Sequence, residues 1–269
     1  MTEITLKNAR KLLKNRIKAL PDTIKGKFET ENAVWQEIKA RGEFTQEDRL
    51  VMLAIMQVPF HDSGKIEGLQ SYDSSASHCK FCHSMMEAAK TNPSIICGHC
   101  YDKKQEEYRT NVKKRHGLQL ELISTIPFSV KELSILPIYT VFFRFNSSGE
   151  IENVIQCVNY IRIGYAFAMI QFRPWSKNKA IVKEAIRQEG KPQNMRFIYS
   201  VPFIDGKCDI LPEGFDYSFV VASTEEKVQE YLAAGAMECN GKMCKDCGYM
   251  CYRVDGWPVG SVIVEKLRA

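Results

Sequence analysis

The segment Tyr139-Thr-Val-Phe-Phe-Arg-Phe145 is a nearly continuous apolar run of strand length. Such a run is typical of a strand that is buried on both faces, as in a parallel sheet. Helical patterns and apolar runs then alternate along the chain: a helix over 151–164, a run at 166–172, a helix over 177–189, runs at 195–201 and 217–222, a helix over 224–234 and a last run near 259–264. This alternation predicts βα units and a parallel sheet, so the predicted fold class is α/β.

The chain around these units divides into two regions. Residues 1–60 show helical apolar spacing, with a first helix that stops at Pro21 and two further helical patterns near 30–41 and 46–57. Residues 61–269 form the expected α/β core, which carries two cysteine-rich, metal-binding loops. Residues 58–100 are rich in Ser, His and Cys and are expected to be irregular, and one helix is expected over about 101–116. Since this core is too short for eight complete units, we predict an open or partial parallel βα barrel with a helical N-terminal appendage.

The composition is that of an ordinary globular protein. The 269 residues include 37 Lys and Arg against 32 Asp and Glu, a formal net charge of +5, and 45% are hydrophobic. These values exclude a disordered chain. No apolar run approaches the roughly 20 residues of a membrane-spanning helix, and the N-terminus has no apolar core with a small-residue cleavage site. We therefore expect a cytoplasmic protein without membrane association.

Eight of the ten cysteines form two sets. The first set has the spacing C-x2-C-x14-C-x2-C and comprises Cys79, Cys82, Cys97 and Cys100. The second set has the spacing C-x4-C-x2-C-x3-C and comprises Cys239, Cys244, Cys247 and Cys251. Closely spaced cysteines place their sulfurs on one tight turn, where they can bind a single metal centre. Disulfides are the alternative, which a reducing cytoplasm disfavours.

The spacing leaves more than one chemistry open. Four thiolates hold zinc or an iron–sulfur cluster equally well. The first set fits a zinc ribbon, whereas three cysteines within eight residues make the second set more typical of a cluster loop. We predict a [4Fe-4S] iron–sulfur cluster as the cofactor, with zinc as the alternative. A third hypothesis is a thiol oxidoreductase centred on Cys97 and Cys100, which requires a strand at Ile95-Ile96 and a helix after Cys100.

Polar residues occur near the ends of the predicted strands. Ligands of parallel α/β sheets bind at the carboxyl ends of the strands, so we predict an anion- or cofactor-binding site formed by Arg144, Asn146, Ser147, Arg173 and Ser200. Two arginines at neighbouring strand ends could clamp an anionic group through charge-assisted hydrogen bonds. The alternative is that each arginine pairs with a nearby acid such as Glu150 or extends to solvent. No sequence motif identifies a catalytic residue.

Several of these motifs resemble the phage gene-product-eighty-eight domain family. The similar elements span residues 75–252 and are Cys100-Tyr101, Arg144-Phe-Asn-Ser-Ser-Gly-Glu150, Phe172-Arg-Pro-Trp-Ser-Lys-Asn178 and Cys239…Cys244-Lys-Asp-Cys247…Cys251-Tyr252. The chain departs from the family at Glu150, where Asp is usual, and at Asp102, where a small residue is usual. The resemblance implies a phage or mobile-element protein with a barrel-like α/β core related to radical-SAM barrels, and iron–sulfur centres.

Three functional hypotheses follow. The first is an iron–sulfur protein, which could be a redox or radical-type enzyme acting on an anionic or nucleotide-like substrate. The second is a zinc-stabilised module that binds nucleic acid or a host protein through its basic N-terminal helix. Residues 1–27 carry eight Lys and Arg against two acids, a charge of +6, although a solvated helix face explains this equally simply. The third is the thiol oxidoreductase.

Overall fold

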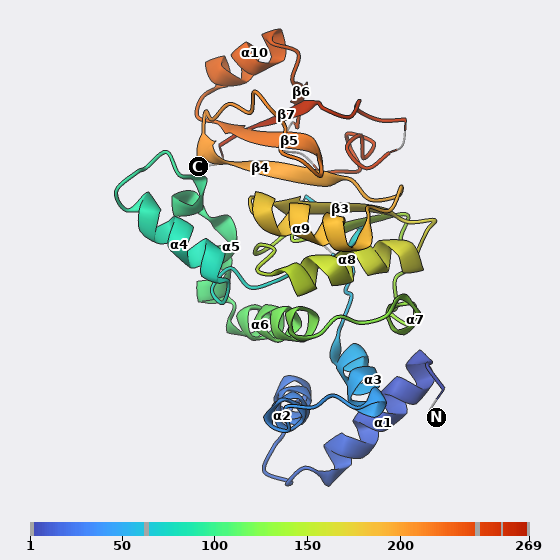
Figure 1. Ribbon diagram of the computed structural model, residues 1–269. Helices are drawn as coiled ribbons and strands as arrows, with labels where there is room; N and C mark the ends of the chain where they lie inside the picture. The colour runs from blue at the N-terminus through green and yellow to red at the C-terminus, as the bar shows by residue number, and fades with distance from the viewer. Residues whose placement is uncertain (1–2, 62–64, 240–242, 254, 268–269) are drawn as a thin grey trace.

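Seven strands form one sheet with the order β1-β2-β3-β4-β5-β7-β6 (Figure 1). The computed structural model describes residues 3–61, 65–239, 243–253 and 255–267. Its strands are β1 (Gln70–Tyr72), β2 (Phe142–Phe145), β3 (Gln171–Ser176), β4 (Phe197–Ile204), β5 (Phe215–Ala222), β6 (Met237–Glu238) and β7 (Val262–Lys266). Neighbouring strands pair in parallel throughout, and the linear order leaves β1 and β6 at the two edges. The predicted α/β class and open parallel sheet are confirmed.

Helices connect most of the strands, as the alternating sequence pattern predicts. Helix α8 (Val154–Ala166) joins β2 to β3, and α9 (Lys179–Glu189) joins β3 to β4. Helix α10 (Glu225–Ala233) follows β5. The other helices of the core precede β2 and are α4 (Lys80–Ala89), η1 (Ile96–His99), α5 (Tyr101–Tyr108), α6 (Thr110–Thr125) and α7 (Val130–Leu133).

The two faces of the sheet differ, and β2 shows the difference most clearly. Side chains of a strand point alternately to opposite faces. Phe143 and Phe145 belong to the main hydrophobic core, where the Phe145 ring stacks 4.0 Å from that of Tyr160 on α8. Phe142 packs instead against a second cluster that includes Tyr252. We call the first side the helix face and the second side, which also carries Arg144, the loop face.

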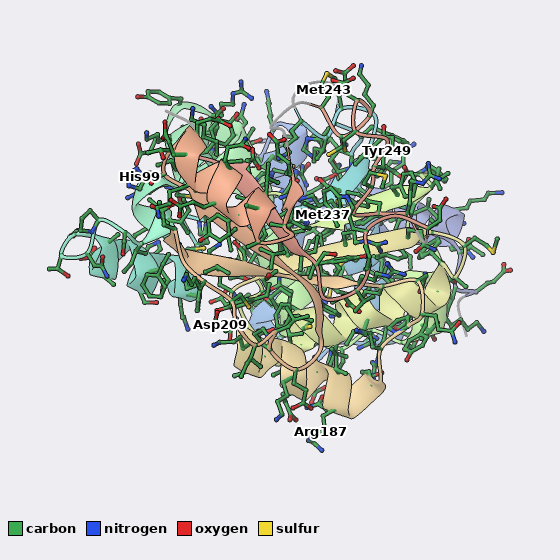
Figure 2. The ribbon with its side chains drawn as sticks, turned by 90° about the horizontal axis from the view of Figure 1, so that it is seen from above. His99, Arg187, Asp209, Met237, Met243 and Tyr249 are labelled. Atoms are coloured by element: carbon green, nitrogen blue, oxygen red, sulfur yellow. The ribbon has the colours of Figure 1, made fainter. Side chains whose placement is uncertain are left out.

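The loop face is covered by the cysteine-rich segment between β6 and β7. The rings of Tyr249 and Tyr252 lie 5.0 and 5.7 Å from that of Phe142. Figure 2 shows Met243 and Tyr249 of this segment on one side of the molecule and Arg187 of α9 on the opposite side. The sheet is therefore enclosed between helices and a loop that carries most of the second cysteine set.

Three helices form the N-terminal region at the end of the molecule remote from α10 (Figure 1): α1 (Leu6–Ala19), α2 (Lys27–Ala40) and α3 (Gln46–Ile55). The predicted helix stop before Pro21 is confirmed, and Thr45 and Asp48 form a capping box that opens α3. Leu13 of α1 is buried in the main core, so this helix packs on the rest of the protein. Among the described residues, no helix is both long and apolar enough to cross a membrane.

Three local predictions were wrong. Residues 58–100, expected to be irregular, contain β1 and α4. The single helix expected near 101–116 is two helices, because the backbone of Arg109 leaves the helical region at φ −114° and ψ 74°. The apolar run 166–172 is the end of α8 and the start of β3, where two elements bury adjacent apolar residues.

Candidate functional site

All four cysteines of the second set line one cavity on the loop face. Cys239 directly follows β6, and the other three belong to the segment that covers the sheet. The cavity measures about 20 Å³, and its walls also include Arg144 and four aromatic side chains, Trp175, Tyr249, Tyr252 and Trp257. The fold thus brings together thiols that are up to 12 residues apart in sequence, against a largely aromatic wall.

Arg173 of β3 fixes the segment that carries these thiols. Its side chain is fully buried, and its guanidinium donates hydrogen bonds to the carbonyl oxygens of Cys251 and Tyr252. It also donates to the carbonyl of Phe172 at 2.7 Å. Burial lowers the pKa of Arg173 to about 10. Arg173 therefore holds the second cysteine set against the sheet through the backbone and is not part of the cavity wall.

Arg144 pairs in register with Arg173 on the neighbouring strand and does line the cavity. Its guanidinium lies 4.4 Å from the centre of the Trp175 ring, a cation–π contact. Its Nε is buried and, within the described part of the chain, has no hydrogen-bond partner. Burial would lower the pKa of Arg144, but Tyr252 and Cys244, with Asp73 and Asp102, raise it above the ordinary value. The cavity therefore faces a permanent positive charge with one donor unused.

Two thiols of the second set, Cys244 and Cys251, are protonated unless a cation compensates them. Burial raises the pKa of Cys251 to about 12 and also raises that of Cys244. A metal that binds such thiols displaces their protons, so folding, ligation and pH are coupled. Among the described residues, no three His, Cys, Asp or Glu side chains are already arranged so that they could hold a metal ion. The donor chemistry fits a thiolate centre, whereas the coordination shell is not closed.

The first set gathers at the carboxyl ends of β2 and β3. Cys79 caps the N-terminus of α4, Cys97 lies in η1 and Cys100 precedes α5. Lys177, directly after β3, is half-buried between Glu150 and three thiols of this set; burial opposes its charge, but Glu150 and these thiols raise its pKa. The pKa of Cys79 is lowered because its sulfur accepts hydrogen bonds from the thiol and the N–H of Cys82. The first set is thus assembled around one cation and one acid.

The thiol oxidoreductase hypothesis required a strand before Cys97. Ile95 makes one isolated antiparallel bridge, to Phe203, and the η1 turn begins at Ile96. The helix expected after Cys100 is present as α5. The strand on which a thioredoxin-like arrangement depends is therefore not formed at Ile95-Ile96.

Two other residues of the predicted anion site have internal roles. The N–H and Oγ–H of Ser147 both donate to Asp73 Oδ1, the first at 2.8 Å, and the N–H of Ser148 donates to the same atom at 3.2 Å. Asn146 adopts φ 56° and accepts a 2.8 Å hydrogen bond from the Tyr160 hydroxyl. The donors of this turn therefore hold it to the end of β1.

The positions expected for Arg144, Arg173 and Ser200 at strand ends were wrong by one to four residues. Arg144 and Arg173 lie inside β2 and β3. Ser200 lies inside β4, which continues to Ile204 across an irregular register that accommodates Pro202. The structure thus brings Arg144 and Arg173 to one face of the sheet and leaves Ser200 on a different strand pair.

A group of acids and one histidine was not predicted. Glu106 of α5 accepts hydrogen bonds from Ser75 Oγ at 3.0 Å and from the Ser77 N–H at 2.9 Å. Its second oxygen lies 3.6 Å from Nδ1 of His116. These contacts hold the segment that leads into Cys79. Since β1 was not expected, Asp73 and its neighbours could not be predicted to lie at a strand end.

Comparison with protein-family models, with curated proteins and with solved structures finds no match for this chain. The resemblance to the gene-product-eighty-eight family therefore stays a prediction that rests on the quoted residues. The two cysteine sets and their surroundings are the features from which a function is inferred.

Proposed function

We propose that this chain is an iron–sulfur protein whose second cysteine set holds a [4Fe-4S] cluster on the loop face of the sheet. The observation that carries the proposal is the combination of four thiols lining one cavity with two guanidiniums beside them, that of the buried Arg173 and that of the half-buried Arg144. The ligands would be Cys239, Cys244, Cys247 and Cys251. A bound cluster would supply one-electron transfer, in redox or radical chemistry on an anionic substrate.

The charges around the cavity support an anionic centre. Within the described part of the chain, neither Arg144 nor Arg173 forms an ion pair with a carboxylate within 4.0 Å. A buried charge without a counter-charge costs on the order of several kcal/mol. Four thiolates around a cation of charge +2 leave a net charge of about −2, which balances the two arginines. The free Nε of Arg144 is a donor suited to a metal-bound sulfur.

The test is the metal content of matched cysteine variants purified without oxygen. Cys247→Ser should lose iron and sulfide together, because it removes one of the four ligands. Cys208→Ser is the control, since this partly exposed thiol belongs to neither set and donates to the carbonyl of Ile210 at 3.6 Å. Iron and sulfide that remain unchanged in Cys247→Ser would refute the ligand assignment.

A single zinc ion is the second candidate, and the size of the cavity favours it. A volume of about 20 Å³ admits one water-sized body, whereas a four-iron cluster would require the loop to move away from the sheet. In that case the second set stabilises the loop, and the protein is a zinc-stabilised binding module. Zinc at one ion per second set, with neither iron nor sulfide, would support this candidate against the first.

The first set is proposed as a further thiolate site with weaker charge compensation. Its neighbours are one cation, Lys177, and one buried acid, Glu150, so no net positive charge balances four bound thiolates. The two sites should therefore differ in how tightly they hold a metal.

A further inference from the structure

A cavity near the N-terminal helices lies between α2 and α6 and has a volume of about 440 Å³. Figure 1 shows α2 and α6 one above the other at this place. The volume falls in the range of small-ligand pockets. We call it the α2–α6 groove; its walls are formed by Phe28, Asn32, His78, Lys113, Lys114, Gly117 and Leu118, with Thr110 and Glu121. No cysteine lines it.

His78 is held in one orientation by a chain of hydrogen bonds. Ser75 Oγ donates to the Glu106 carboxylate at 3.0 Å, and a hydroxyl has only one hydrogen to donate. At its 2.8 Å contact with His78 Nδ1, Ser75 must therefore accept, so Nδ1 carries a proton. Among the described residues, Nε2 has no hydrogen-bond partner. A buried carboxylate thus orients an exposed imidazole at the groove.

Gly117 makes room for this ring. A Cβ atom at position 117 would lie 3.0 Å from two atoms of the His78 ring and 3.3 Å from Nε2. The ring consequently lies directly against the backbone of α6, next to the apolar surface of Leu118 and Phe28. The absence of a side chain at this position sets the depth of the groove.

The rim of the groove is positively charged. Lys113 forms no ion pair among the described residues, and Lys114 Nζ lies 3.8 Å from Glu29, a loose and exposed pair. The acid at the other end, Glu121, is already engaged by Trp35 Nε1 at 2.8 Å and Lys39 Nζ at 3.1 Å. The donors that remain available are two ammonium groups and the Asn32 amide, and His78 Nε2 is an available acceptor.

We propose that the α2–α6 groove binds a phosphate-bearing ligand with a ring, such as a nucleotide or one nucleotide of a nucleic-acid strand. The two ammonium groups would bind the phosphate oxygens, because point charges suit an anion with several acceptors. His78 Nε2 would accept a hydrogen bond from a hydroxyl or amino group of the ring-bearing part of the ligand. The ring would pack on the apolar floor beside Phe28 and Leu118. This site is independent of the metal proposal, since it uses no cysteine and no part of the loop face.

The experiment is equilibrium binding of the full chain to adenosine monophosphate, to inorganic phosphate and to a short single-stranded oligodeoxynucleotide. We expect saturable binding of the nucleotide or the oligonucleotide, with inorganic phosphate weaker. The better of these two ligands identifies the source of the phosphate. The double variant Lys113→Ala/Lys114→Ala should bind about tenfold more weakly or worse, as should His78→Ala.

The matched control is Lys183→Ala, an exposed lysine of α9 that pairs only with Glu213. It should leave the affinity unchanged. No saturable binding of either nucleotide ligand would overturn the proposal, as would full affinity in the double variant. Inorganic phosphate that binds as tightly as the nucleotide would refute a role for the apolar floor. All three substituted side chains reach solvent, and an unchanged thermal transition would confirm that each variant is folded.

Discussion

Arg173 shows most clearly what one residue contributes to the candidate centre. A guanidinium on β3 satisfies the carbonyl groups of Cys251 and Tyr252, which a loop without secondary structure cannot pair by itself. The sequence predicted an arginine at a ligand site, and the residue instead binds the backbone of the ligand-bearing loop. Periodicity identified its strand, but nothing in the sequence relates position 173 to position 251, because that contact is set by tertiary packing.

Replacement of Arg173 should therefore destabilise the whole protein. Arg173→Leu removes the donor to the carbonyl groups of Cys251 and Tyr252, whereas the Phe172 carbonyl keeps the N–H of Arg196. We expect the free energy of unfolding to fall by about 3 kcal/mol or more. Urea unfolding measures it. Arg187→Gln is the control, because Arg187 is exposed and pairs with Glu184 on the same helix, so the change should be far smaller. Equal effects of the two variants would contradict the clamp.

The pair formed by Glu106 and His116 should make stability depend on pH. Burial opposes the charge of Glu106, but the nearby His116 ring and hydrogen bonds from Ser77 and Ser75 lower its pKa from 4.5 to about 2, so its contribution is present above pH 4.5 and is lost toward pH 2. Burial likewise opposes the charge of His116, yet Glu106 and Asp73 raise its pKa above 6.5, so its contribution is present below pH 6.5 and is lost as pH rises through the folded value.

The stabilisation by this pair should consequently be largest between about pH 4.5 and 6.5. The measurement is the difference in unfolding free energy between the unsubstituted protein and Glu106→Gln. It is made at about pH 3, 5.5 and 8, which lie below, within and above this pH range. We expect the maximum at the middle pH. A difference that does not change across the three conditions would show that the two side chains do not act as an ion pair.

At the scale of elements, the sequence predicted the repeating part of the fold best. Helices α8, α9 and α10 and strands β2, β4 and β5 were anticipated because each combines a clear period with suitable length. Strand β1 was not, since three residues, Gln70 to Tyr72, are too short for any period; they pair with β2, and Gln70 forms one isolated bridge with Phe60. The convergence of the second cysteine set could be expected from spacing, but its position on the loop face depends on long-range packing.

Helix α1 illustrates how one element combines packing with charge. Ala9 and Leu13 are buried, whereas the basic side chains are exposed, among them Lys7, Lys11 and Lys14. Leu13→Ala should lower the unfolding free energy by about 2–3 kcal/mol, because it opens a cavity in the core. Lys11→Ala should change it by less than about 0.5 kcal/mol. Thermal or urea unfolding of both variants is the measurement, and a neutral Leu13→Ala would mean that α1 does not pack on the core.

At the scale of the whole molecule, the sheet separates two different environments for thiols. The first set lies at the carboxyl ends of β2 and β3 beside Lys177 and Glu150, and the second lies on the loop face beside two arginines. Arg144 is influenced by Cys244 on one side and by Asp102, two residues after Cys100, on the other. Both sets therefore belong to one connected region.

Because the charges differ, the two sets should release metal at different rates. A chelator should remove the metal in two phases, the faster one from the first set. Cys82→Ser should abolish the fast phase and preserve the slow one, and Cys247→Ser should do the reverse. The readout is the released metal against time in a colorimetric assay. A single phase that both variants reduce equally would contradict separate sites.

The second cysteine set is proposed to be a thiolate metal centre. Two quantities measured together test this most directly: the amount of metal bound per chain and the number of free thiols. We expect bound iron with sulfide, or bound zinc for the second candidate. We also expect fewer reactive thiols in the native protein than the ten cysteines of the sequence. Unfolding in the presence of a chelator should then release the remainder. Protein that is folded, free of any metal and as reactive at Cys244, Cys247 and Cys251 as at Cys208 would contradict it.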